Sequence, residues 1–123
     1  MELNFEINKP IYIQIVEEIR KDIVNEIYKE GEKIPSVRYL ALELNVNPNT
    51  VQKALIILEN EGLLITARTN GKYVTTNKDL IQSIRKEKAQ ELTNEYLNNI
   101  INMGYSDEEI INLIMEEMAK WRY

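Results

Sequence analysis

The sequence contains no cysteine and no histidine among its 123 residues. Without cysteine it can form neither a disulfide nor a thiolate metal site, and without histidine it lacks the commonest general base and imidazole ligand. No apolar run approaches the roughly 18 residues that a membrane-spanning helix needs. The first ten residues lack the basic and apolar regions of a signal peptide. These absences predict a cytoplasmic protein with no metal, no cofactor, no membrane partner and no enzymatic activity.

The formal net charge is −5, which at first argues against a nucleic-acid partner. The distribution of charge matters more than the sum. Residues 1–78 contain ten Lys and Arg against eleven Asp and Glu, whereas residues 79–123 contain five against nine. The excess acid therefore lies mainly in the C-terminal third, and the nearly neutral N-terminal part can still carry a local basic face.

A short extended lead precedes the first expected helix. We expect a strand over residues 3–7, and Pro10 suits the first turn of a helix because its missing N–H is not needed there. Isoleucine then recurs every four residues, which predicts an apolar stripe on a helix that ends near Tyr28. The stripe consists of Ile11, Ile15, Ile19, Ile23 and Ile27.

Two more helices are expected before residue 62. Ser36 has the chemistry of an N-cap for the first, and Asn45 tolerates the left-handed conformation that ends it. Asn47 and Pro48 form a cap and first helical residue for the second. Gly62 should stop that helix. The connection between these two helices is therefore only a few residues long.

A hairpin and a helical tail are expected after the third helix. The β-prone runs 63–66 and 72–75 flank Asn70-Gly71, a dipeptide that favours a tight hairpin turn. Helix is predicted again over 79–103, followed by a last short helix that begins with a capping box, Ser106 to Glu109. The fold class expected is mainly α with a small β hairpin (α+β).

Two short helices joined by a tight turn and followed by a hairpin are typical of a winged helix-turn-helix. With Val51, Leu55 and Leu58 facing the core, the outward side of the third helix carries polar residues suited to base edges and phosphates. Such residues are more often plain solvated surface. The coincidence of a polar helix start, a basic preceding helix and a basic hairpin tip favours DNA binding. The outward residues are Asn49, Thr50, Gln52, Lys53 and Ile56.

Residues 10–74 resemble the DNA-binding domain of the GntR family of bacterial transcription regulators. The resemblance is carried by "GEKIPSVRYLA", "NPNTVQKAL", "LENEGLL" and the glycine-containing wing. It implies a dimer that binds a short palindromic operator, with Arg38 on the DNA backbone. It also matches Asn49 and Thr50 to the family's polar pair, and Gly71 to the wing glycine. Many relatives have arginine where this chain has Pro48 and Gln52, so it should rely more on amide groups than on charge.

The residues that we predict to contact DNA come from the second helix, the third helix and the wing. They are Lys33, Ser36, Arg38, Asn47, Asn49, Thr50, Gln52, Lys53, Arg68, Gly71 and Lys72. We accordingly expect a winged helix-turn-helix DNA-binding domain over 9–77. The expected function is a sequence-specific transcription regulator, a dimeric repressor on a palindromic operator. A winged-helix adaptor that binds protein remains the alternative.

The region over 78–123 is similar to the tail of the short YtrA-like branch of the family, which ends in two helices used for dimerisation. Its apolar content exceeds what two helices bury by themselves. We therefore expect a homodimer, with a monomeric helical cap as the alternative, and leave open a small-molecule effector of unknown identity. The predicted dimerisation residues are Leu92, Tyr96, Ile100, Ile110, Leu113, Ile114, Met118 and Trp121.

Overall fold

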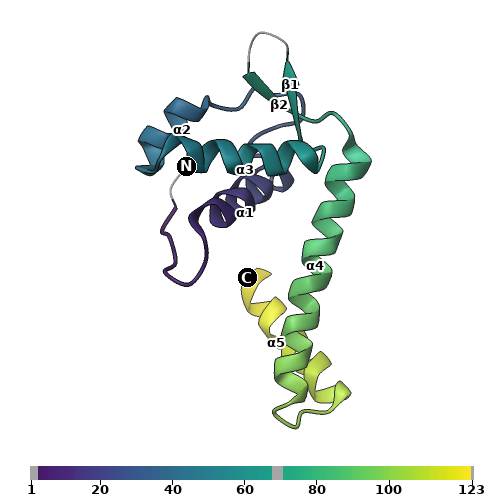
Figure 1. Cartoon of the computed structure of the whole chain (residues 1–123). Coiled ribbons are helices and arrows are strands. Elements are labelled where there is room, and N and C mark those ends of the chain that lie inside the picture. The colour runs from purple at the N-terminus through teal and green to yellow at the C-terminus, as the bar shows by residue number, and fades with distance from the viewer. Residues whose placement is uncertain (1–2, 68–70, 123) are drawn as a thin grey trace. The chain divides into compact units, whose positions relative to one another are not determined.

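The structure is a computed structural model that describes residues 3–67 and 71–122 (Figure 1). Its elements are α1 (Ile11–Val24), α2 (Val37–Leu44), α3 (Pro48–Asn60), β1 (Leu64–Ala67), β2 (Gly71–Val74), α4 (Lys78–Ile101) and α5 (Asp107–Arg122). This order confirms the expected mainly α fold with a small β hairpin. The chain divides into two compact units, Met1–Arg85 and Lys86–Tyr123, and the division falls within α4. The functional division after residue 77 stays a prediction.

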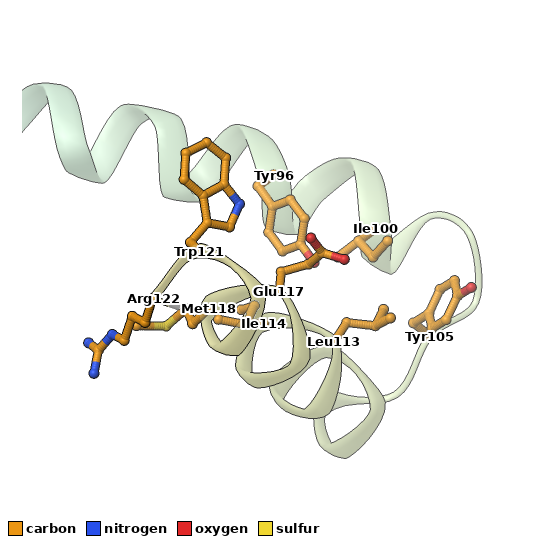
Figure 2. A pocket seen from close by; sticks show the side chains of 9 residues that line it. All are labelled: Tyr96, Ile100, Tyr105, Leu113, Ile114, Glu117, Met118, Trp121 and Arg122. Carbon is orange, nitrogen blue, oxygen red and sulfur yellow. The ribbon is translucent and has the colours of Figure 1, made fainter.

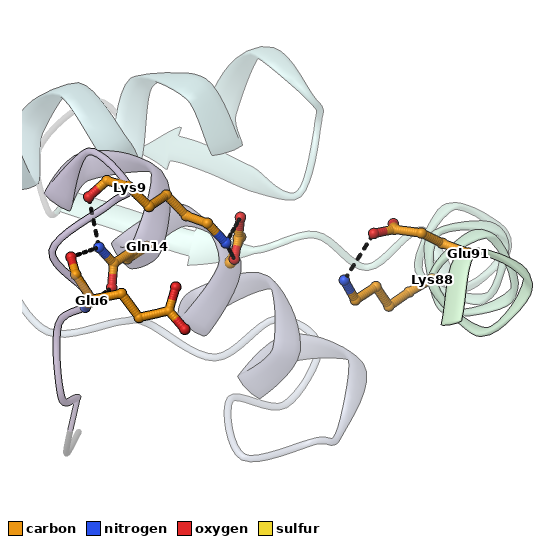
Figure 3. Close-up of polar contacts among 6 residues, drawn as sticks. Glu6, Lys9, Gln14, Lys88 and Glu91 are labelled. Carbon is orange, nitrogen blue, oxygen red and sulfur yellow. Dashed lines mark hydrogen bonds and ion pairs between the residues drawn. The ribbon is translucent and has the colours of Figure 1, made fainter. Parts of the chain in front are cut away.

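The lead before α1 is irregular, so the predicted strand over 3–7 is wrong. Its backbone is instead bound by the amide of Gln14, which is only 6% exposed (Figure 3). Gln14 Oε1 accepts from the Glu6 N–H over 2.8 Å, and Gln14 Nε2 donates to the carbonyls of Glu6 and Lys9 over 2.9 and 2.8 Å. One side chain thus supplies the donor and acceptor that a neighbouring strand would have supplied. α1 follows, with Pro10 as its N-cap residue.

α1 ends at Val24, earlier than the apolar stripe predicts. Its last carbonyls are satisfied by a Schellman turn, in which the Glu26 N–H donates to Ile23 O over 3.2 Å and the Ile27 N–H to Asp22 O over 2.8 Å. This turn requires a left-handed residue, and Glu26 adopts φ +60°. Ile27 therefore leaves the stripe and is 65% exposed.

The core of the first unit lies between α1, α2 and α3, with the hairpin and the start of α4 added to it. α3 packs against both α1 and α2, and it also contacts β1. Its side chains Val51, Ala54, Leu55 and Leu58 are buried, as the sequence predicts. The buried apolar residues from the other elements include Ile15, Ile19, Ile23, Leu40, Leu44, Leu64, Val74 and Ile81.

The caps of α2 and α3 confirm the residues expected at their ends. Ser36 Oγ accepts from the Tyr39 N–H over 3.1 Å, and Asn45 closes α2 in the left-handed conformation with φ +55°. Asn47 caps α3, with Pro48 as the first helical residue. Gly62, with φ +82°, follows the end of α3. Because both termini are set by local chemistry, the turn between α2 and α3 is fixed by only a few residues.

The hairpin is attached to the segment that precedes α2. β1 pairs antiparallel with β2, and the pairs run from Leu64 with Val74 to Ala67 with Gly71. Lys33 bridges to Tyr73 on the other side of β2. The Ile34 N–H donates to the Lys72 carbonyl over 3.0 Å. The strands begin one residue from the predicted runs, and Asn70 of the expected turn lies outside the described residues.

The second unit consists of most of α4 followed by α5. Gly104, with φ +90°, follows α4 as expected. Ser106 and Glu109 form the predicted capping box: Ser106 Oγ accepts from the Glu109 N–H over 3.2 Å, and Glu109 Oε1 accepts from the Ser106 N–H over 3.0 Å. The hydrogen bond that the carboxylate accepts from the Ser106 N–H, with a smaller contribution from the Ser106 hydroxyl, lowers the pKa of Glu109. No helix in the described part of the chain combines the length and apolar character needed to cross a membrane.

Candidate nucleic-acid interface

The N-terminus of α3 is built by Asn47. Its Oδ1 accepts from the Asn49 N–H over 2.8 Å, so this oxygen is occupied by the cap. Asn47 is exposed and retains its amide NH₂ as a donor for a phosphate or a base. Pro48 has no N–H to satisfy, and the first turn of α3 carries no acidic residue. The positive end of the helix dipole is therefore not compensated within this turn.

α3 has the two faces that the sequence predicts. Asn49 and Gln52 are exposed, Thr50 is half-buried, and Ile56 is partly exposed one turn further on. The opposite face packs into the core. Asn and Gln can each pair with adenine through two hydrogen bonds in the major groove, which is the chemistry of direct base readout.

Lys53 has an internal partner that the sequence did not reveal. Its Nζ lies 3.9 Å from the centroid of the Tyr12 ring, a cation–π contact between α3 and the first turn of α1. Tyr12 is partly buried and packs against the core. The contact gives the exposed Lys53 ammonium a preferred position over the Tyr12 ring, and its charge stays accessible. The only hint in the sequence is that Tyr12 stands beside the isoleucine stripe of α1, which must pack on α3.

The start of α2 supplies the second part of the interface. The hydroxyl oxygen of Ser36 is used as the N-cap. Arg38 is exposed in the first turn of α2, and Lys33 is exposed just before it. Among the described residues, neither Arg38 nor Lys33 forms an ion pair. Both cations are thus available to phosphates.

The wing contributes less free charge than the sequence suggests. Lys72 Nζ lies 2.8 Å from Glu59 Oε2 of α3 and 3.0 Å from Thr66 Oγ1 of β1. Thr66 Oγ1 also donates to Glu59. The positive charge of Lys72 is therefore balanced by a carboxylate that our sequence analysis did not assign. Arg68, at the predicted wing tip, lies outside the described residues.

Gly71 begins β2 in a conformation that few other residues adopt. Its φ is +87°, and a Cβ at this position would lie 3.4 Å from Cε of Lys33. The glycine thus serves the backbone of the wing and leaves room for the Lys33 side chain. Lys33 and Lys72 both lie at the turn end of the wing, where Lys33 forms no ion pair with the described residues and Lys72 is paired with Glu59.

Potential metal ligands are not grouped in the described part of the chain. Within residues 3–67 and 71–122 there is no group of three or more acidic, histidine or cysteine side chains that could hold a metal ion. Asp22 is a buried acid of α1, and burial, with a smaller contribution from Glu18, raises the pKa of its carboxyl. It lies on the helix that packs against α3.

The second unit exposes a large apolar surface. A cavity of about 610 Å³ lies between α4, α5 and the turn that joins them (Figure 2). Six of the predicted dimerisation residues line it: Tyr96, Ile100, Leu113, Ile114, Met118 and Trp121. Trp121 is 87% exposed in the single chain. Leu92 is also exposed, whereas Ile110 is 4% exposed and is already buried without a second chain.

The match to known proteins covers both units. The model of the bacterial regulatory proteins of the gntR family matches residues 11–74. The HTH-type transcriptional repressor YtrA of Bacillus subtilis is 34% identical over 112 residues, 91% of this chain and 81% of that protein. A GntR family transcriptional regulator from Listeria monocytogenes is 38% identical, with a TM-score of 0.85 over 91% of this chain and 98% of that one.

One solved relative is bound to DNA. The DNA-binding domain of AraR in complex with operator ORE1 is 31% identical, with a TM-score of 0.54 over 60% of this chain and 90% of that one. The expected resemblance, including the YtrA-like branch, is thus confirmed. The chain belongs to the gntR family of bacterial regulatory proteins and is a DNA-binding transcription regulator.

Proposed function

We propose that this chain is a homodimeric repressor that binds a palindromic operator. One observation carries the DNA-binding part of the proposal: α3 buries its apolar face and leaves Asn49 and Gln52 exposed beside an uncompensated helix N-terminus. Each protomer would place α3 in the major groove, while Arg38 and Lys33 contact the phosphates on either side. Because phosphate contacts carry no sequence information, the amide side chains would supply the specificity.

The homodimer is supported by the exposed apolar surface of the second unit. A monomer rarely leaves a contiguous apolar surface of this kind in water. Trp121, Met118 and Ile114 lie on α5 and face the same cavity as Tyr96 and Ile100 of α4. A second copy of this unit would cover them. Two winged helices joined in this way can bind two half-sites one DNA turn apart.

Regulator activity further suggests a cytoplasmic location, where the chromosome of a bacterium lies. Regulation by a small-molecule effector of unknown identity stays a prediction. Its binding would have to change the spacing between the α3 helices of the two protomers. The cavity of the second unit is the first place to test for such a ligand. We propose no enzymatic activity.

Selection from a random duplex library, followed by titration of the selected sequence, tests the operator proposal. We expect a palindrome, and an affinity about 10³-fold or more above that for random DNA. Arg38→Ala should weaken binding to all sequences alike, whereas Asn49→Ala should change the preference at particular base pairs. Equal affinity for every duplex would refute a sequence-specific regulator. Absence of DNA binding, with capture of a protein partner, would instead support the adaptor.

Sedimentation of the full chain tests the homodimer. Met118→Glu places a charge in the cavity of the second unit and should convert the dimer to a monomer. Asn112→Glu adds the same charge at an exposed polar position of α5 and serves as the matched control. A wild-type chain that sediments as a monomer at micromolar concentration would refute the proposed dimer.

A further inference from the structure

The turn end of the wing holds two lysines in different electrostatic states. Lys33 is exposed, and its Cε lies 3.4 Å from the Cβ position of Gly71. The Lys72 side chain is only 14% exposed and forms its ion pair with Glu59 over 2.8 Å. Glu59 itself is 36% exposed, so water and ions can reach the pair from the carboxylate side. Two cations at one place on the fold therefore differ in their availability to a phosphate.

A carboxylate at the position of Glu59 does not stabilise α3. Glu59 is in the last turn of α3, where the backbone carbonyls already make the potential negative. Its carboxylate is compensated there by Lys72, together with the hydroxyl of Thr66. The pair connects α3, the helix that we propose to lie in the major groove, to both strands of the wing. Its favourable interactions are therefore those with Lys72 and Thr66, and we look for its role there.

We propose that Glu59 competes with DNA phosphate for Lys72 and thereby limits the affinity of this chain for DNA of any sequence. The proposal rests on the DNA-binding function proposed above. A cation that is already neutralised by the protein releases no counterion from DNA, so it adds nothing to sequence-independent binding. Binding then depends more on base contacts by Asn49 and Gln52, which raises the ratio of specific to non-specific affinity.

Replacement of Glu59 by glutamine makes the proposal testable. The Glu59→Gln substitution keeps the size of the side chain and one acceptor oxygen but removes the charge that holds Lys72. One additional phosphate contact makes the slope of log affinity against log salt steeper by about 0.9. The affinity for a random-sequence duplex should then rise about eightfold at ~0.1 M salt and about threefold at ~0.3 M salt.

Glu61→Gln is the matched control. Glu61 follows α3 directly and also forms an ion pair, with Arg20 of α1. Both substitutions remove one negative charge from the same end of the helix, but only Glu59→Gln releases a cation of the wing. We expect Glu61→Gln to leave the salt slope unchanged. A third variant, Lys72→Met, should remove the effect of Glu59→Gln on the slope when the two are combined.

Titration of random-sequence and selected duplexes over a range of salt, on full-length chains checked by thermal unfolding, separates the outcomes. A steeper slope for Glu59→Gln alone, abolished by Lys72→Met, supports competition. Unchanged or weaker binding by a folded Glu59→Gln variant means that the pair only fastens the wing, which overturns the proposal. An equal rise for Glu59→Gln and Glu61→Gln means a general charge effect and also overturns it. A wild-type chain that binds no duplex refutes the proposed function itself.

Discussion

The left-handed glutamate at the end of α1 should cost stability that a glycine would restore. Glu26 has φ +60° in the Schellman turn, a conformation that costs a residue with a Cβ about 1–2 kcal/mol. Glycine adopts it freely, but its unfolded chain has about 0.5–1 kcal/mol more conformational entropy to lose. The difference predicts that Glu26→Gly stabilises the protein by about 0.5–1 kcal/mol, which is a rise in Tm of roughly 2–5 °C for a chain of this size.

Thermal unfolding followed by circular dichroism measures this gain, and two variants isolate its cause. Glu26→Ala removes the side-chain charge but keeps the left-handed strain, so it should give no comparable gain. Asn25→Gly changes the preceding residue, whose φ is −88°, and should destabilise because glycine offers no advantage there. If Glu26→Gly is no more stable than Glu26→Ala, the backbone conformation is not the source of the cost.

Three further predictions concern the interface and the core. Asn47→Ala removes the cap of α3 and should destabilise the fold by about 1 kcal/mol, measured by urea unfolding, with Ser at the same position restoring most of it. Gly71→Ala forces a Cβ into φ +87° and should lower Tm and weaken DNA binding in a mobility-shift assay, since this φ strains the backbone at the turn end of the wing. Burial raises the pKa of Asp22, so its ionised form disfavours the folded state; Asp22→Asn should stabilise at neutral pH, and the gain should shrink as the pH falls toward the ordinary pKa of 3.8. A gain that is constant with pH would show that Asp22 does not titrate with a raised pKa.

The elements whose ends depend on local chemistry could be predicted from the sequence. The capping side chains bind N–H groups at most three residues away, so the local order of residues is enough to locate them. They are Ser36, Asn47 and the Ser106–Glu109 box. The lead could not be predicted, because alternating apolar residues suit both a strand and an irregular segment. The outcome was decided by Gln14, whose amide satisfies the backbone of the lead from another element.

The electrostatic state of the interface could not be predicted from the sequence for the same reason. A lysine in a sequence shows a charge but not the partner that holds it. Lys72 meets Glu59 only because the hairpin folds back on α3, and Lys53 meets Tyr12 only because α1 crosses the same helix. Both pairs join residues from different elements. The exposure of the polar side chains on α3 was predictable, whereas the availability of the neighbouring cations was not.

Because the first unit has few free cations, its proposed DNA binding depends on dimerisation through the second unit. With Lys72 balanced by Glu59, the exposed cations for one half-site in the described residues are chiefly Arg38, Lys33 and Lys53, and Lys53 also contacts the Tyr12 ring. Few phosphate contacts give weak binding by a single winged helix. Joining two copies makes the second half-site an intramolecular contact, which can raise affinity by roughly 10²–10⁴ without any new contact. The proposed repressor therefore needs the apolar surface of its second unit for DNA binding, and Met118→Glu should weaken operator binding even though it alters no residue of the DNA interface.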